Sequence, residues 1–560
     1  MKNEDALDSS PTALISPFMD NHERSYFLAH RPNPAAVAAA EPEPYRRIGI
    51  IGGGTAGFLV ALALRARLPH LDITLIESSS IPIIGVGEAT TPHIIPFLHN
   101  ICKIDMLDFY QNVRPTWKLG IKFEWGKPDM SHFLAPFDWD ENSVGMVGSL
   151  RYDGNINAMT ITSLFMDQQR APILTNEDGG FTSLLPYISH AYHLENRRLV
   201  SYLHKVADSR GVKHLDRKIT DVVLTPDGEQ VDHVVTDQGE NLSFDLFIDC
   251  SGFRSLLLDQ KLKTPFVSYA STLYTDRALT FSTPHDGKIK PYTTATTMNS
   301  GWTWTIPHEE RDNHGYVFSS AFCSPDEAER EARARWPRMN EVSDVVSFRS
   351  GRHEAGWRGN VVAIGNAHAF VEPLESTGLL MICLTIQKLV SIFPRSKRDD
   401  SARMLLNSFL AQKWDGLRWF IGVHYKFNRR LDTPFWQEVR ANADVSGAEL
   451  LLRAYESSAP LICYDEEVSR ILWGSGIPAI CGVSGYDCLL LGQGVPTRLL
   501  DVTEPREAWE KRKQFGVELA KRGIDHARAL ALVKERPELL HQELTAPGNY
   551  SRRNFPAAMR

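Results

Sequence analysis

The chain has 560 residues, of which 43% are hydrophobic and 23% are charged. This composition excludes a disordered, collagen-like or low-complexity protein, and the length is sufficient for a large α/β domain with a further module. The 61 basic and 68 acidic residues leave a formal charge of −7, which gives no general attraction to nucleic acid or anionic lipid. We therefore expect neither nucleic acid nor a membrane as partner, and we favour chemistry on a small molecule.

The cysteines and the N-terminus indicate the compartment. The seven cysteines form no CxxC pair and no cluster with histidine at metal-ligand spacing, so we expect no metal site. At this low density they indicate reduced thiols in the cytoplasm. No basic region followed by an apolar core is present at the N-terminus, so we expect no secretion signal. Residues 1–45 are polar and rich in Pro and Ala, which predicts an extension or linker.

The first predicted elements are a strand, a tight turn and a helix. Residues 47–51 are a short apolar run that leads into glycines, and residues 58–64 are an apolar stretch suited to a buried helix. A second apolar run, residues 73–76, ends at Glu77 and completes a βαβ unit of about 30 residues. Strands joined by such a crossover are parallel, so the sequence predicts an α/β fold with a parallel sheet.

Further strands are predicted in the middle of the chain. Residues 222–224, 231–235 and 246–248 have strand character around a turn at residues 226–228. A later apolar run, residues 361–364, also reads as a strand that ends in small residues. The middle of the chain is therefore mixed α and β.

The pattern changes near the C-terminus. Long amphipathic stretches such as residues 403–419 and 507–532 carry interspersed Glu and Lys or Arg, as solvent-facing helices do. We expect an α/β domain over residues 46–395 and a mainly helical module over residues 396–560 that covers the substrate site.

Three glycines between the first strand and helix have the spacing Gly52-x-Gly54-x-x-Gly57, and Glu77 follows 20 positions after the last. Such glycines let backbone N–H groups and the helix N-terminus approach a pyrophosphate, while a carboxylate accepts hydrogen bonds from ribose hydroxyls. A glycine turn without a ligand is the alternative, but three spaced glycines are conformationally costly. The motif predicts a dinucleotide site and does not distinguish FAD from NAD.

Glycine-rich segments elsewhere favour FAD. Residues 84–92 follow the second strand and form a strap that contains Gly87, suited to lie over a flat ring system. Two later strands end in small residues at Gly252 and Gly365, where the backbone can approach the same ligand. Structural turns explain each of these segments about as well as contact with a cofactor.

A lysine lies in a predicted strand. Alternation over residues 117–125 puts five apolar residues on one face and Lys118, Gly120, Lys122 and Glu124 on the other. From the residues alone, a solvated strand face is the favoured interpretation of these lysines.

Four segments together point to a known family. They are Gly52–Gly57, Gly85–Thr90, Met298–Pro307 and Phe370–Gly378. In these segments the chain resembles the flavin-dependent tryptophan halogenases, from about residue 46 to about residue 440. The tetrad Trp302-x-Trp304-x-Ile306-Pro307 is the family's distinguishing signature against flavin hydroxylases.

The resemblance implies a Rossmann-like, FAD-binding fold of the flavin monooxygenase type over residues 46–395. Reduced FAD from a separate NAD(P)H-dependent flavin reductase reacts in this family with O2 and chloride or bromide to give hypohalous acid. The acid then travels through a tunnel to an electron-rich aromatic substrate that never reaches the flavin. The positions that match FAD contacts are Gly52, Gly54, Thr55, Ala56, Gly57, Glu77, Gly87, Glu88, Ala89, Thr90 and Gly365.

The family's functional positions fall on named residues here. The match assigns the essential lysine to Lys118 and the catalytic carboxylate to Glu375, which otherwise reads as a helix N-terminal acid. A lysine suits this task, either as an ammonium that polarises hypohalous acid or as an amine that is itself halogenated. Thr377 and Gly378 match the backbone amides that hold the halide. The tunnel positions are Trp302, Trp304, Ile306 and Pro307.

The sequence departs from enzymes that act on free tryptophan. Their substrate-binding histidine falls on Ala135, whereas their aromatic residue remains as Phe137. The C-terminal substrate-reading stretch is also poorly matched around Trp473. We therefore expect another arene as substrate, such as an indole, a tryptophan within a peptide or another small aromatic molecule.

An aromatic cluster in the helical module has two interpretations. It is either a stacking surface for the substrate or helix core, and Trp436 is the member that we assign as a candidate substrate contact. Its members are Trp414, Trp419, Phe420, His424, Tyr425, Phe427, Phe435 and Trp436.

Two other functions fit the dinucleotide motif. A flavin monooxygenase that hydroxylates an aromatic is the first, and only the tetrad at 302–307, Lys118 and Glu375 argue against it. A non-enzymatic flavin-binding protein is the second. For oligomeric state we expect a monomer or a homodimer.

Overall fold

The computed structural model describes residues 43–81, 87–138, 143–285, 287–340, 342, 344–461, 470–471, 481–501 and 504–541. Within that part of the chain, residues 45–393 and 400–541 belong to one compact unit. Residues 43–44 and 394–399 belong to a second, small unit, in which Lys397 Nζ lies 3.2 Å from a carboxylate oxygen of Glu43. Nearly all of the expected N-terminal linker lies outside the described residues.

A six-stranded sheet has the order β10-β2-β1-β14-β23-β22. Its strands are β10 (Lys213–Asp216), β2 (Asp72–Glu77), β1 (Arg47–Ile51), β14 (Leu246–Asp249), β23 (Val361–Ala363) and β22 (Trp357–Arg358). The first five strands are parallel, with Ile50 of β1 opposite Leu75 and Ile248, and only the edge strand β22 is antiparallel. The predicted βαβ unit and parallel sheet are confirmed.

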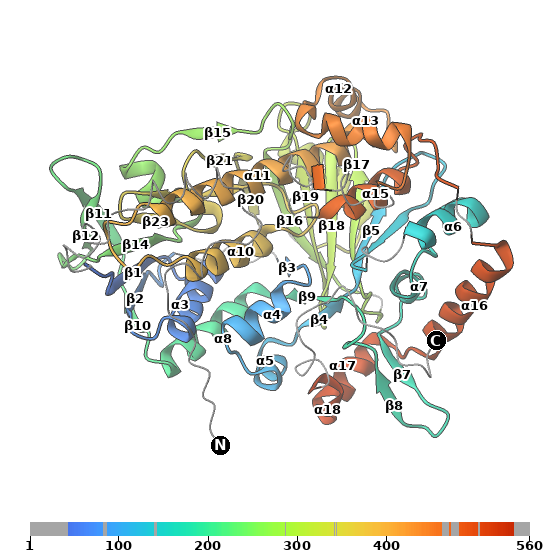
Figure 1. Ribbon diagram of the computed structural model, residues 1–560, viewed down its shortest axis with the longest axis horizontal. Helices are drawn as coiled ribbons and strands as arrows, with labels where there is room; N and C mark the ends of the chain where they lie inside the picture. Colours follow the sequence, from blue (N-terminus) through green and yellow to red (C-terminus); the bar gives the residue numbers. More distant parts are fainter. Residues whose placement is uncertain are drawn as a thin grey trace, which may run out of the picture. The chain divides into compact units, whose positions relative to one another are not determined.

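Helices cover one face of this sheet and a hairpin covers the other (Figure 1). Helix α3 (Thr55–Arg67) starts directly after the glycines and packs against α8 (Asn196–Ser209) and α10 (Gly378–Ser391), which explains why it is apolar on nearly every side. On the opposite face, valines of β11 (Ile219–Leu224) and β12 (Val231–Thr236) join one apolar cluster with residues of β1, β2 and β14.

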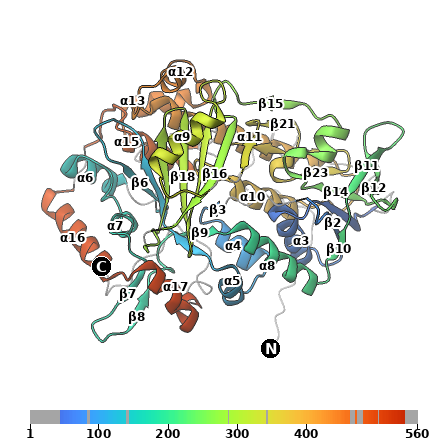
Figure 2. The same cartoon turned by 180° about the vertical axis from the view of Figure 1, so that it is seen from behind.

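A seven-stranded sheet has the order β20-β16-β19-β18-β17-β5-β6 and carries α9 (Pro325–Arg335) on one side (Figure 2). Its strands are β20 (Asp344–Ser347), β16 (Arg277–Thr283), β19 (Asp312–Phe318), β18 (Gly301–Pro307), β17 (Thr293–Met298), β5 (Gly120–Glu124) and β6 (Phe133–Pro136). The tryptophan tetrad therefore lies on a central strand, β18.

The strand predicted over residues 117–125 is interrupted at Leu119. The part before it, β4 (Thr116–Lys118), pairs in a three-stranded sheet with β9 (Ala191–Leu194), which also pairs with β3 (Glu88–Ala89). The part after it, β5, belongs to the seven-stranded sheet. This change of sheet places Lys118 at the junction between the two.

Smaller elements complete this part of the chain. The further strands are β7 (Ile173–Thr175), β8 (Phe181–Ser183), β13 (Asn241–Leu242), β15 (Phe266–Ser268), β21 (Gly351–His353) and β24 (Ala369–Phe370). The further α-helices of this part are α4 (Ile94–Pro96), α5 (Met106–Val113), α6 (Ser143–Asp153) and α7 (Ile161–Asp167).

The described residues after position 400 are mainly helical, as expected. The helices are α11 (Ser401–Phe427), α12 (Pro434–Asn442), α13 (Glu449–Ser457), α15 (Gly482–Gly492), α16 (Arg506–Arg522), α17 (His526–Glu535) and α18 (Glu538–His541). The predicted helical stretch 507–532 is two helices, because the chain leaves the helix at Gly523 and Asp525 caps α17 by accepting from Arg528 N at 3.1 Å.

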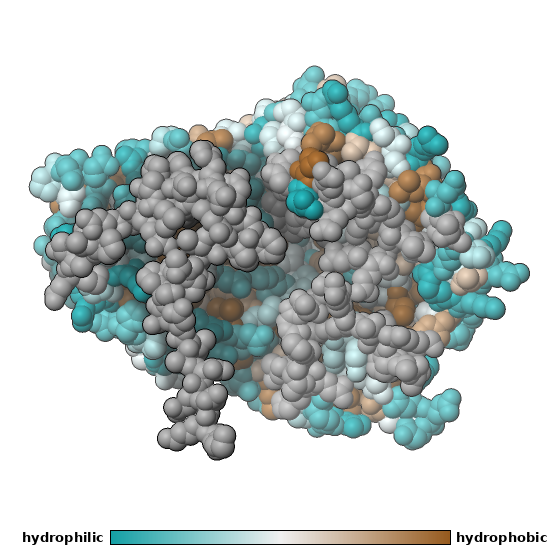
Figure 3. All heavy atoms as spheres, viewed as in Figure 1, coloured by the Kyte–Doolittle hydropathy of each residue, from teal (hydrophilic) through white to brown (hydrophobic). Residues whose placement is uncertain are grey.

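One face of the described residues is largely hydrophilic (Figure 3). On the face in Figure 3, hydrophobic residues form small, separate groups among hydrophilic ones. None of the helices in the described ranges is sufficiently long and apolar to cross a bilayer.

Candidate active site

The glycine turn after β1 contains two kinds of glycine. Gly52 has φ +112°, and a Cβ there would lie 2.4 Å from the carbonyl oxygen of Cys250, while a Cβ at Gly57 would lie 1.9 Å from the carbonyl oxygen of Gly52. These two glycines are required by the fold itself. A Cβ at Gly54 would meet no atom within 4 Å, so this is the position where the turn is open to a ligand.

The predicted ribose carboxylate lies against the turn. A Cβ at Gly53 would lie 1.7 Å from Glu77 Oε2, and Glu77 Oε1 accepts a hydrogen bond from His214 Nε2 at 2.9 Å. His214 also joins His204 and Asp208 in a group whose possible metal-ligating atoms lie within 4.8 Å of one another. The sequence does not reveal this group, because His214 comes from a different element than the other two.

The remaining residues of the predicted dinucleotide site converge on the same turn. Thr55 Oγ1 donates to Asn196 Oδ1 at 2.8 Å, which ties the start of α3 to the start of α8. Gly365, with φ +68°, follows β23, and a Cβ there would lie 3.5 Å from Ala56 Cβ. The structure thus brings together segments that are 300 positions apart in the chain.

The described part of the predicted strap, residues 87–92, contains β3, which pairs with β9. The strand of Lys118, β4, pairs with the same strand β9. Gly87 has φ +75°, and a Cβ there would lie 2.7 Å from His308 Nε2. Thr90 Oγ1 donates to the carbonyl oxygen of Tyr192 at 2.7 Å, so the strap is attached to β9. Burial raises the pKa of the Glu88 carboxyl to about 7. Residues 82–86 of the strap lie outside the described residues.

Lys118 is completely buried, with 0% of its surface exposed. Its Nζ donates to Ser376 Oγ at 2.7 Å and lies 5.2 Å from the ring centroid of Phe137. Burial lowers the pKa of Lys118 to about 7, and the nearby Glu375 partly opposes this shift. The solvated-face interpretation is wrong for Lys118 and describes only Lys122, which is half-buried and lies 3.6 Å from Glu124.

The segment that meets the lysine is the loop before α10. Ser376 has φ +58°, a strained conformation for a non-glycine residue, and this turn directs its hydroxyl to Lys118. Glu375 is 6% exposed, and its Oε1 lies 2.6 Å from His424 Nε2. Sequence analysis missed Ser376 and His424, although Ser376 is adjacent to Glu375 and His424 belongs to the aromatic cluster.

The N-terminus of α10 lies next to this loop. Thr377 is buried, and its Oγ1 has no hydrogen-bond partner among the residues that the structure describes. A Cβ at Gly378, the first residue of α10, would meet no atom within 4 Å. Free backbone N–H groups at a helix start favour an anion, and Gly378 leaves space beside this one.

Trp302 and Trp304 lie side by side on β18, with ring centroids 6.0 Å apart. Trp302 Nε1 donates to Glu372 Oε1 at 2.9 Å, and Tyr425 OH donates to the same oxygen at 2.6 Å, while Thr275 Oγ1 donates to Glu372 Oε2. The Glu372 carboxylate is completely buried and needs these donors. Sequence analysis did not identify it, although it lies three positions before Glu375.

Pro307, the last residue of the tetrad, is hydrogen-bonded to β4, the strand that contains Lys118. Thr116 Oγ1 donates to the carbonyl oxygen of Pro307 at 2.7 Å and lies 3.2 Å from His193 Nδ1, which must then be the donor in that contact. His193 Nε2 in turn accepts from Thr293 Oγ1 at 2.9 Å. Burial lowers the pKa of His193 well below its ordinary value, so this network is held together by neutral groups.

The three candidate substrate contacts have different positions. Phe137 is half-buried, and its ring centroid lies 5.2 Å from Lys118 Nζ. Trp436 lies in the core, with 0% of its surface exposed and its Nε1 donating to the carbonyl oxygen of Met298 at 2.8 Å, so no face of this indole is open. The core interpretation therefore describes the position of Trp436. Trp473 lies outside the described residues.

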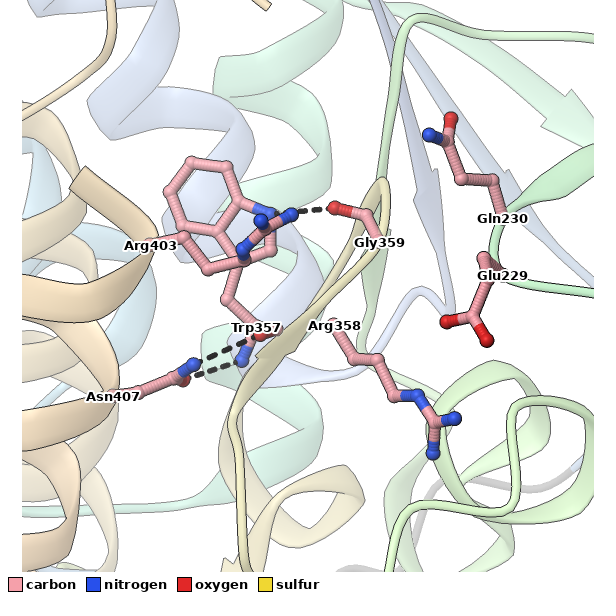
Figure 4. A pocket seen from close by; sticks show the side chains of 7 residues that line it. All are labelled: Glu229, Gln230, Trp357, Arg358, Gly359, Arg403 and Asn407. Carbon is pink, nitrogen blue, oxygen red and sulfur yellow. Dashed lines mark hydrogen bonds between the residues drawn. The ribbon is translucent and has the colours of Figure 1, made fainter. Parts of the chain in front are cut away.

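A pocket of about 350 Å³ lies at the edge strand β22, and none of its lining residues is among the predicted site residues (Figure 4). Its lining comes from β22, α11 and the turn between β11 and β12. Asn407 on its wall already pairs with the backbone N–H and carbonyl of Trp357, at 2.8 and 2.9 Å. We therefore assign the active site to Lys118 and the loop before α10, and not to this pocket.

The residues around the glycine turn fit a flavin dinucleotide. The turn is open at Gly54, Glu77 lies at the end of β2, and α10 presents an open N-terminus at Gly378. Two buried polar atoms, Thr377 Oγ1 before α10 and His308 Nε2 beside Gly87, have no partner within the described ranges. Such atoms are expected where a bound group completes their hydrogen bonds.

Comparisons with known proteins show which family the chain is similar to. The sequence model of the family described as Tryptophan halogenase matches residues 47–501. Tryptophan 6-halogenase SttH from Streptomyces toxytricini is 35% identical over 499 residues, which cover 82% of this chain and 92% of that enzyme. Tryptophan 7-halogenase RebH from Lentzea aerocolonigenes is 30% identical over 82% of this chain and 91% of that enzyme.

A solved structure extends the similarity. The crystal structure of MibH, described as a lathipeptide tryptophan 5-halogenase, superposes with a TM-score of 0.87 at 50% identity and covers 92% of this chain and 98% of that chain. The FAD-binding, Rossmann-like fold expected from the resemblance is thereby confirmed. The chain belongs to the tryptophan halogenase family of flavin-dependent enzymes.

Proposed function

We propose that this enzyme halogenates an electron-rich arene with hypohalous acid that Lys118 holds next to the substrate. The observation that carries the proposal is the complete burial of Lys118, whose Nζ has a hydroxyl partner on the loop of Glu375 and an aromatic ring, Phe137, beside it. A buried ammonium or amine without a carboxylate partner at hydrogen-bond distance is costly and needs a functional reason.

We assign the binding of reduced FAD to the glycine turn, Glu77, the strap and Gly365, and the binding of chloride or bromide to Thr377 and Gly378. When bound, reduced FAD would supply two electrons and two protons, which together with one further proton convert O2 and a halide ion into hypohalous acid and water. We further propose that Trp302, Trp304, Ile306 and Pro307 separate the flavin from the substrate. The rigid hydrogen bonds of Trp302 to Glu372 and of Pro307 to Thr116 support this assignment.

Lys118 and Glu375 then act on the second step. Lys118 Nζ orients the hypohalous acid, and because the pKa of Lys118 lies near 7, both the ammonium and the amine are populated at neutral pH. Glu375 exchanges a proton with the reacting groups as the halogen enters the ring and the ring loses its hydrogen. Burial excludes water, which would otherwise compete for the oxidant.

For the substrate we favour a tryptophan within a peptide. Ala135 stands where free-tryptophan enzymes of this family carry a histidine, and the 50% identical MibH is described as acting on a lathipeptide. One aromatic contact, Phe137, remains beside Lys118. An alanine in place of a histidine at this position leaves more room for a substrate larger than an amino acid.

The test is a reconstituted reaction. Purified protein is incubated with FAD, NADH, a flavin reductase, O2 and bromide, and with free tryptophan, an N-acyl tryptophan amide and tryptophan-containing peptides. We expect a bromine isotope pair on a peptide product and little or none on free tryptophan. A gain of one oxygen without bromine would support the hydroxylase instead, and flavin binding without any product would support a non-enzymatic protein.

A further inference from the structure

His424 of α11 lies against the side chain of Glu375. Its imidazole is completely buried and packed between two phenylalanines, with ring centroids 5.5 Å from Phe123 and 4.9 Å from Phe420. Its Nε2 lies 2.6 Å from Glu375 Oε1, and its Nδ1 lies 2.9 Å from the carbonyl oxygen of Phe420, one helical turn earlier. Both ring nitrogens are therefore engaged, and the ring has one orientation.

The hydrogen bonds fix the location of a proton. A carbonyl oxygen only accepts, so Nδ1 of His424 carries a proton and donates it to Phe420. The short contact between Nε2 and Glu375 then requires at least one more proton, either on the imidazole or on the carboxyl group. In both cases the pair holds a proton that Glu375 can release without any movement of the backbone.

We infer that His424 is the positioning residue of Glu375 and that the two side chains together hold the proton that the halogenation exchanges. The inference rests on the proposed function. As the C–X bond forms and the O–X bond of hypohalous acid breaks, the leaving hydroxide takes the proton of the pair and becomes water. The ring then loses its hydrogen as a proton, which the pair takes up, so the pair ends in its starting state.

Four other titratable groups among the described residues lie near the pair. Lys118, Glu372 and the thiols of Cys481 and Cys488 interact electrostatically with members of the pair. Burial raises the pKa of both thiols well above the ordinary value, so they stay neutral. Glu372 is occupied by its own three donors.

Two substitutions separate a proton carrier from a plain hydrogen-bond partner. In His424→Gln an amide N–H still reaches toward Glu375 but cannot take up a proton, and in His424→Phe the aromatic volume remains without any polar atom. We expect both variants to lose at least about tenfold in halogenation kcat, within the range for acid–base groups, with substrate KM and flavin oxidation unchanged. Wild-type kcat in His424→Gln would overturn the inference, because a partner without a titratable proton would then suffice.

A matched control is His314→Gln. His314 is also buried and bonded through both ring nitrogens, to Thr305 and Thr283, and its ring stacks on Phe281 on the α9 side of the seven-stranded sheet. We expect it to lower thermal stability without lowering the ratio of product formed to flavin oxidised. An equal loss of this ratio in the control would show that any buried imidazole has the effect and would contradict the inference.

A spectroscopic test needs no activity. In protein labelled with ¹⁵N-histidine, we expect one strongly deshielded, exchange-protected proton in the hydrogen bond between an imidazole Nε2 and a carboxyl oxygen, and we expect Glu375→Gln to remove it. If the folded wild type lacks this resonance, or if Glu375→Gln retains it, the shared proton is refuted. Because the spectrum does not depend on turnover, it separates a failure of this inference from a failure of the proposed function.

Discussion

The glycine turn of residues 52–57 and the surroundings of Lys118 are built in opposite ways. The turn is mostly local: strand, glycines and helix follow one another, and the carbonyl oxygen of Gly52 excludes a side chain at Gly57, although the backbone that excludes one at Gly52 is that of the distant Cys250. The lysine region is assembled from distant segments, because the partners Lys118 and Ser376 are 258 positions apart. The glycine turn offers open space beside the backbone, whereas the Lys118 region consists of buried polar side chains that are hydrogen-bonded to one another.

This difference determines what each region tolerates. A ligand that lies along a backbone turn needs only that no side chain intrudes. Buried polar groups need partners, and each of Lys118, Glu375 and Glu372 has a hydrogen-bond partner from another segment. We expect substitutions in the turn to act on binding and folding, and substitutions around Lys118 to act on chemistry.

The largest effect on chemistry is expected for Glu375→Gln, which keeps the shape of the side chain but removes its ability to exchange a proton. We expect the halogenation kcat to fall at least about 100-fold, the lower end for a lost acid–base group, while FAD still binds. Product mass spectrometry and flavin fluorescence measure the two quantities. Equal turnover would reduce Glu375 to a structural residue.

A matched pair in the turn separates folding from binding. Gly57→Ala places a methyl group 1.9 Å from the carbonyl oxygen of Gly52, so we expect a loss of about 1–3 kcal/mol in the free energy of unfolding. Gly54→Ala meets no protein atom, so we expect stability within about 0.5 kcal/mol of wild type but weaker FAD binding. Urea unfolding and flavin titration test both, and similar stability of the two variants would contradict this account.

The buried amine makes stability depend on pH. The pKa of Lys118 is about 7 in the folded chain, against an ordinary value of 10.5, so between these values the unfolded chain binds a proton that the folded chain does not. The contribution of Lys118 to the free energy of unfolding therefore becomes more favourable as the pH rises above about 7, and it is least favourable below that pH. We expect the free energy of unfolding of Lys118→Met to exceed that of wild type by the largest amount at pH 6. This difference shrinks by about 1 kcal/mol per pH unit from pH 7 to pH 9. A difference that stays constant across this range would mean that Lys118 is not desolvated.

The smallest effect concerns the strained turn at Ser376. Ser376→Ala and Ser376→Gly both remove the hydroxyl partner of Lys118, but only glycine adopts φ near +58° without strain. We expect Ser376→Gly to be more stable than Ser376→Ala by about 1 kcal/mol in thermal unfolding, with halogenation reduced in both. Equal stability would show that the turn relaxes when the hydroxyl is lost.

The two regions also differ in what their sequences reveal. The apolar runs at 47–51 and 73–76 and the glycine spacing predict the βαβ unit, because all the interactions that define it are close along the chain. Alternation over 117–125 correctly places an apolar face but not the burial of Lys118, since the strand changes sheets at Leu119. That change depends on pairing with β9, which is about 75 residues further on.

The partners of the catalytic groups are the least predictable. Glu375 meets His424 from 49 positions away, and Glu372 meets Trp302 from 70 positions away. Short patterns do not encode such contacts, because the residues come together only when α11 and β18 pack on the loop before α10. The sequence shows the aromatic cluster but not that Trp436 lies in the core, because that position depends on packing.

One measurement tests the central claim that Lys118 acts on the oxidant after it has formed. Wild type and Lys118→Ala, each loaded with one equivalent of reduced FAD, are mixed with oxygenated bromide buffer and a tryptophan peptide, and flavin oxidation and brominated product are followed together. We predict that both proteins oxidise the flavin at similar rates, while only wild type brominates the peptide. Bromination by Lys118→Ala at the wild-type yield would contradict the account.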